Sequence, residues 1–158
     1  MLPINRLLEY QAEVCATLLD DNTNKLFNYS TMIVDDSELS KVLEERTDEE
    51  SAFLISVVPS FNLSGAENAS KWNNTLLFFI LEKTDYSAHD RDTFLDIFTR
   101  TQSITQQFVD KLLEDKADNN SLFCGFLSWL NEEYITVDPV WKKQGCNGWM
   151  VQINLETI

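Results

Sequence analysis

The sequence predicts an α+β fold: an antiparallel or mixed β-sheet with an N-terminal helix and one long central helix packed on one face. Three observations predict it. Apolar residues recur at helical spacing in residues 4–19 and again in residues 94–112, and residues 149–156 place an apolar side chain at every second position. The order of helix, strands, long helix and strands is typical of a sheet that carries its helices on one face. With 158 residues and no internal repeat or linker, the chain is expected to form a single domain over residues 1–158.

The first helix is predicted over residues 4–19, and a polar run at residues 20–24 ends it. A short strand is expected within residues 27–34 and a short helix within residues 37–45. The apolar stripe of the first helix is expected to consist of Ile4, Leu7, Leu8, Val14, Cys15, Leu18 and Leu19.

Two apolar runs in the middle of the chain predict strands. Residues 52–58 are rich in β-forming side chains, and Pro59 closes the run. Residues 60–74 carry Gly, Ser and Asn and are expected to form a loop. Residues 75–81 are apolar after Thr75, which favours a central strand covered on both faces, although periodicity alone leaves a buried helix open.

The long helix is predicted to begin near Ser87 and Asp90 and to end within residues 116–120. Its apolar stripe turns polar at residues 101–103, where a bend is expected if the helix bends at all. A strand follows at residues 133–138, which Pro139 is expected to stop.

A hairpin is expected to close the fold. Residues 144–148 have turn chemistry, and they lie between the strand at residues 133–138 and the strand that opens at Trp149.

The charge balance argues against direct, sequence-specific binding to nucleic acid. Twenty-six acidic side chains face twelve Lys and Arg, which gives a net charge of −14, and no basic patch is present to replace counterions on phosphate. The acidic run at residues 44–50 is interpreted either as a solvated segment or as a surface that avoids nucleic acid or mimics it for a basic partner. Its carboxylates belong to Glu44, Glu45, Asp48, Glu49 and Glu50.

Cysteine usage indicates a reducing compartment. Cys15, Cys124 and Cys146 are scattered without a metal-binding spacing, which is typical of reduced, structural thiols. The N-terminus lacks the form of a signal peptide, and no apolar run is long enough to span a bilayer, so no membrane association is expected.

No constellation of catalytic residues appears in the sequence. His89 is the single histidine, and with Asp90 it is interpreted as part of a helix start rather than as a metal ligand. Phosphate-binding glycine loops and a GxSxG elbow are absent. We therefore expect no enzymatic activity, no cofactor, no metal and no small-molecule substrate.

The tryptophans suggest protein contacts instead. Trp72 and Trp141 lie in polar, turn-like surroundings and are candidate interface residues, together with the acidic run at residues 44–50. Trp129 and Trp149 are expected to pack in the core.

The layout and the closing residues resemble a family of phage proteins. An N-terminal helix, paired strands, a long helix and a hairpin that ends in residues 146–157, with Gly148-Trp149 before an alternating strand, are similar to the tail-completion and tail-terminator (neck) proteins of tailed bacteriophages, as in phages and prophages of Bacteroidota. The resemblance implies a virion protein assembled in the bacterial host cytoplasm. It would form a ring with copies of itself at the head–tail junction or along the tail, in contact with portal, neck or tail proteins. It implies no catalytic residues.

A second hypothesis comes from the charge rather than from the resemblance. A small acidic inhibitor, such as an immunity protein or a nucleic-acid mimic, would use the same carboxylates to bind a basic protein rapidly and tightly. The ring subunit needs two complementary faces, whereas the inhibitor needs one concentrated acidic patch.

Overall fold

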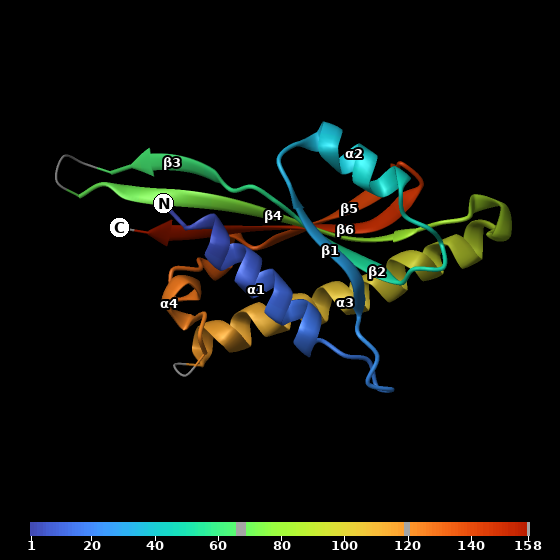
Figure 1. Cartoon of the computed structure of the whole chain (residues 1–158), viewed down its shortest axis with the longest axis horizontal. Helices are drawn as coiled ribbons and strands as arrows, with labels where there is room; N and C mark the ends of the chain where they lie inside the picture. The colour runs from blue at the N-terminus through green and yellow to red at the C-terminus, as the bar shows by residue number, and fades with distance from the viewer. Residues whose placement is uncertain (66–68, 119–120, 158) are drawn as a thin grey trace.

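The chain folds around one mixed six-stranded sheet with helices on both faces (Figure 1). The computed structural model describes residues 1–65, 69–118 and 121–157. The helical segments are α1 (Ile4–Thr17), α2 (Asp36–Glu44), η1 (Tyr86–Ala88), α3 (Arg91–Ala117), α4 (Cys124–Leu127) and η2 (Glu132–Tyr134). The strands are β1 (Phe27–Ile33), β2 (Ala52–Val57), β3 (Ser60–Ser64), β4 (Lys71–Lys83), β5 (Thr136–Lys143) and β6 (Cys146–Thr157).

The strand order is β1-β2-β4-β6-β5, and β3 pairs with the first part of β4. The β1–β2 pair is parallel and all other pairs are antiparallel, which makes the sheet mixed. The predicted α+β fold, with its N-terminal helix and long central helix, is therefore confirmed.

The larger core lies between the sheet and the helices α1, α3 and α4. Alternate residues of β4 point into it, and Phe78 contacts Phe108 of α3 with ring centroids 5.0 Å apart. Both rings are buried, so this contact fixes the long helix against the central strand.

A smaller core lies on the opposite face, under α2. Leu39 and Leu43 of that helix pack on Phe53, Ile55 and Leu81. Cover on this face is incomplete, because Leu77 and Phe79 of β4 stay half-buried. The central strand predicted at residues 75–81 is part of β4. It is covered along its whole length on one face, but only near its C-terminal end on the other.

The first helix buries a different stripe from the predicted one. Leu7 and Val14 are buried as expected, but Tyr10 and Gln11 share the buried face. Ile4 and Leu8 are exposed, which corrects the prediction. Gln11 was not predicted to be buried, because the prediction used apolar residues only and its side chain is polar. It donates to the carbonyl oxygens of Thr31 and Leu54 and so joins α1 to β1 and β2.

Two further sequence predictions are wrong. Residues 60–74 are not all loop, because β3 forms at Ser60–Ser64 and β4 already begins at Lys71. The polar side chains of β3 lie mostly at the surface, so no apolar alternation marked it. Pro139 does not stop its strand either, since β5 runs through it. β5 is an edge strand, where a missing N–H leaves no neighbour unpaired.

Gly148 fits a close approach between β6 and β4. Its φ is +151°, and a Cβ at this position would lie 2.2 Å from the carbonyl oxygen of Ile80. Any larger residue would push the two central strands apart.

Candidate protein-binding site

The last residues of β5 and the turn that follows them (residues 141–145) are called the β5–β6 turn here, and they present Trp141 of β5 to solvent with an exposed fraction of 66%. The backbone around it is unusual, because Lys142 and Gln144 have φ angles of 55° and 49° although neither is glycine. Such conformations are disfavoured for L-residues and persist where surrounding contacts hold them.

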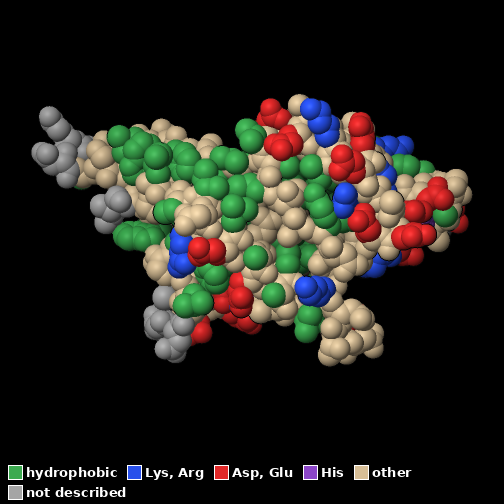
Figure 2. Space-filling model, in the orientation of Figure 1, with side chains coloured by type: hydrophobic (Ala, Val, Ile, Leu, Met, Phe, Trp, Pro, Cys, Tyr) green, Lys and Arg blue, Asp and Glu red, His purple; other side chains and the backbone are tan. Residues whose placement is uncertain are grey.

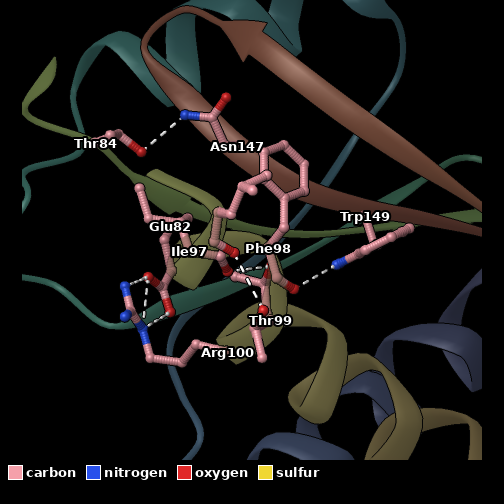
Figure 3. Close-up of polar contacts among 10 residues, drawn as sticks. Glu82, Thr84, Ile97, Phe98, Thr99, Arg100, Asn147 and Trp149 are labelled. Atoms are coloured by element: carbon pink, nitrogen blue, oxygen red, sulfur yellow. Dashed lines mark hydrogen bonds and ion pairs between the residues drawn. The ribbon is translucent and has the colours of Figure 1, made fainter. Parts of the chain in front are cut away.

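The contacts that hold the turn converge on Asn147, whose side chain is fully buried. Its Oδ1 accepts a hydrogen bond from the backbone N–H of Lys142 at 2.9 Å. Its Nδ2 donates to Thr84 Oγ1 at 2.8 Å and to Tyr86 Oη at 2.9 Å, and Figure 3 shows the first of these bonds. The amide therefore ties the turn to η1, a segment far away in the sequence.

The hydroxyl of Tyr86 is partly desolvated. Burial raises the pKa of this hydroxyl, and the hydrogen bond from Asn147 opposes this shift only in part. This hydrogen bond from Asn147 Nδ2 orients the ring.

The N-terminal half of α3 is anchored beside this turn. Trp149 Nε1 donates to the carbonyl oxygen of Phe98 at 3.2 Å, and Arg100 forms a two-pronged ion pair with the buried carboxylate of Glu82, with a shortest distance of 2.6 Å (Figure 3). Phe94 lies between Phe98 and Tyr86, with ring centroids 5.6 and 5.9 Å away. A row of aromatic rings therefore runs from the sheet to the surface.

These elements form a surface depression of about 300 Å³ that we name the aromatic pocket. The ammonium group of Lys142 lies over two of its rings, 5.3 Å from the centroid of Tyr86 and 5.1 Å from that of Trp141. Its lining residues are Tyr86, His89, Asp90, Phe94, Trp141 and Lys142.

Carboxylates, all but that of Glu50 exposed, gather at the same end of the molecule as the aromatic pocket, on α2 and the loop after it. Lys83 joins the two regions, because its Nζ donates to the carbonyl oxygens of Leu43 at 2.9 Å and of Gln144 at 2.8 Å. Lys143 also forms an ion pair with Asp36 of α2. We name these carboxylates the acidic surface: Asp35, Asp36, Glu38, Glu44, Glu45, Asp48, Glu49 and Glu50.

Few cations neutralise the acidic surface. Arg46 pairs with Glu50 at 3.2 Å, but among the described residues Glu44, Asp48 and Glu49 have no ion pair. In Figure 2 red carboxylates, with blue Lys and Arg side chains among them, lie over α2 and toward the η1 end of the molecule. Negative charge therefore predominates on α2 and the loop after it, at the same end of the molecule as the aromatic pocket.

The structure brings together most of the predicted interface residues. Trp141 and the acidic run at residues 44–50 lie at one end of the molecule, because Lys83 pairs with Cys146 across β4 and β6. Trp72 does not join them. It lies eleven positions earlier on β4 (83 − 72), roughly 36 Å away along the strand, where it pairs with Thr157.

The sequence analysis missed Tyr86, Phe94, Lys142 and Asn147 as parts of this site. Asn147 was interpreted as a turn residue. Its neighbours in the sequence do not indicate a buried side chain with several hydrogen bonds. The expectation of core packing for Trp129 is wrong, since its exposed fraction is 39%, whereas Trp149 is half-buried.

The described residues contain no group of three or more His, Cys, Asp or Glu side chains that could hold a metal ion. His89 lies at the aromatic pocket, and its buried Nδ1 has no hydrogen-bond partner among the described groups. Cys15 and Cys146 are free thiols, and the side chain of Cys124 lies outside the described part of the structure.

Comparisons with models of known protein families, with curated proteins and with solved structures find no match to this chain. Within the described residues, no helix has both the length and the apolar composition needed to cross a membrane.

Proposed function

We propose that this chain is a non-enzymatic protein-binding domain that binds a basic protein through the acidic surface and the aromatic pocket. The observation that supports it best is their shared location. An exposed Trp on an anchored turn lies at the same end of the molecule as eight carboxylates of α2 and the loop after it, and Lys83 and Lys143 connect the two regions. Exposed Trp and Tyr side chains often carry most of the energy of an interface.

The charge of the partner follows from the charges of this chain. Among the described residues, seven Lys and Arg side chains, of twelve in the sequence, already form ion pairs with carboxylates of the same chain. A second copy therefore offers little positive surface to the acidic surface, and nucleic acid would be repelled by it. The charge of the acidic surface therefore fits a partner that is a basic protein other than a second copy of this chain. An acidic inhibitor or a nucleic-acid mimic has such a partner.

Charge-neutralising variants test this proposal. The triple variant Glu44→Gln/Asp48→Asn/Glu49→Gln removes three unpaired charges of the acidic surface. The control triple variant Glu13→Gln/Glu114→Gln/Glu133→Gln removes three exposed charges elsewhere. We expect tagged wild type and the control to capture the same basic protein in a salt-sensitive manner, and the first variant to lose it. Equal capture by all three chains would contradict the proposal.

A second candidate function is the ring-forming virion subunit of a phage neck or tail. The observation that favours it is a second, chemically different surface at the far end of the sheet. There Leu63 is 53% exposed, Trp72 is half-buried, and hydrophobic side chains cover the β3 end in Figure 2. A ring needs two different and mutually complementary surfaces on each subunit, and this apolar region is a candidate for one of them. Sedimentation of the purified chain tests it: a closed ring of many copies supports the virion subunit, and a monomer contradicts it.

A further inference from the structure

We propose that the aromatic pocket receives a cationic side chain of the basic partner, an arginine in preference to a lysine, in the position that the ammonium group of Lys142 occupies in the free protein. This inference rests on the proposed function and specifies how that site recognises its partner.

The position of Lys142 shows that the pocket accommodates a cation. Its Nζ lies within about 6 Å of two ring centroids at once, which is the range in which a cation is attracted to an aromatic face. The two rings come from η1 and from β5, segments far apart in the sequence. Asp90, which caps α3 by accepting from the N–H of Thr93 at 2.9 Å, lines the same depression and adds a negative charge.

The rings are pre-organised, whereas the cation is not. Asn147 orients Tyr86 through its hydroxyl and holds the backbone of Lys142, so that Trp141 keeps its place on the turn. The side chain of Lys142, by contrast, is exposed and forms no ion pair with a described residue. An incoming cation can therefore displace it into solvent without breaking a salt bridge.

Arginine suits the vacated position better than lysine does. A planar guanidinium stacks on aromatic rings, is more weakly hydrated than an ammonium group and keeps donors free for a carboxylate such as that of Asp90. Lys142 thus competes with the partner, and its removal should strengthen binding rather than weaken it.

The test uses L-argininamide as the probe and the indole N–H signals of the ¹⁵N-labelled protein as the readout. The Trp141→Phe variant assigns the Trp141 signal. We expect argininamide to shift this signal but not that of Trp72. We expect L-citrullinamide, which keeps the α-ammonium group but has an uncharged side chain, to shift neither. Equal shifts from the two probes would overturn the inference.

The variant Lys142→Met tests the same inference through an increase in affinity for argininamide. It keeps a long side chain but removes the competing charge, so argininamide should bind about three- to tenfold more tightly. The control Lys41→Met removes an exposed charge from the same end of the molecule and should change the dissociation constant less than about twofold. Unchanged or weaker binding to Lys142→Met would overturn the inference.

The outcomes separate this inference from the proposed function. If the neutralised triple variant loses the basic protein while argininamide leaves the Trp141 signal unmoved, the arginine site is wrong and the function stands. If the neutralised triple variant still captures the basic protein, the proposed function is wrong, whether or not argininamide shifts the Trp141 signal.

Discussion

The two ends of the β4–β6 ladder differ in charge although the same two strands build both. At one end lie the acidic surface and the aromatic pocket, where carboxylates outnumber cations. At the other end lies an arm formed by β3 and the adjoining ends of β4 and β6. In residues 52–65 and 69–81 the one charged side chain is Lys71, which pairs with Glu156 at 3.2 Å.

Each end also has a buried asparagine. Asn147 joins the turn and η1 at the acidic end, and Asn74 joins the N-terminus to the arm. The backbone N–H of Leu2 donates to Asn74 Oδ1 at 2.8 Å, and Asn74 Nδ2 donates to the carbonyl oxygen of Leu155 at 2.7 Å. Each end therefore has a buried amide that joins separate segments of the chain, although the two ends differ in charge.

The largest expected effect concerns these two amides. Asn147→Ala and Asn74→Ala each remove several hydrogen bonds from a buried site, and each should lower the free energy of unfolding by about 3 kcal/mol. Only Asn147→Ala should change the indole N–H signal of Trp141. Urea denaturation and ¹⁵N spectra check both points, and a shift of that signal in Asn74→Ala would break the comparison.

The next effect is a pH dependence at the acidic end. Burial raises the pKa of Cys146 from 9.0 to about 11, with Lys83 opposing the shift and Glu50 adding to it. Because the folded pKa is above the unfolded pKa, the unfolded chain loses this proton first. The stabilisation is therefore complete below pH 9 and is lost as the pH rises toward 11.

Denaturation curves measured between pH 8 and 11 check this dependence. The loss should reach about 2–3 kcal/mol, and Cys146→Ala, which lacks the thiol, should not show this component. The same slope in both chains would assign the pH dependence to other groups.

A smaller effect concerns the rate at which the basic partner binds. The triple variant Glu44→Gln/Asp48→Asn/Glu49→Gln should slow association about tenfold at low salt and less at high salt, because unpaired charges steer the encounter and salt screens them. Surface plasmon resonance at several salt concentrations measures the rate. A change confined to the dissociation rate would contradict electrostatic steering.

The smallest effect is expected in the arm. Lys71→Met breaks an exposed ion pair and should change the free energy of unfolding by less than about 0.5 kcal/mol. Binding of the basic partner should stay unchanged, because the arm lies at the far end of β4. Thermal unfolding and the same binding assay check this, and weaker binding would extend the binding site to the arm.

The elements predicted from the sequence are those with a strong periodic signal. α3 and β6 bury regular apolar stripes and were predicted close to their observed bounds. β3 was missed because Ser60, Asn62 and Ser64 are polar, and its pairing with β4 depends on backbone hydrogen bonds rather than on side-chain pattern.

The candidate site was predictable only in parts. Trp141 and residues 44–50 could be singled out because a Trp in a polar turn and a run of acids are visible in any sequence. Their convergence depends on the antiparallel register that sets Lys83 against Cys146, and this register is a long-range property. The role of Asn147 depends on partners some sixty positions away, so no local pattern reveals it.

Native mass spectrometry of the tagged chain, purified from its own source with whatever binds it, tests the central claim most directly. The account predicts a complex with one basic protein at low stoichiometry. This complex should dissociate as the salt concentration rises, and it should be absent with the neutralised triple variant. A closed ring of identical copies that is indifferent to those three substitutions would contradict it.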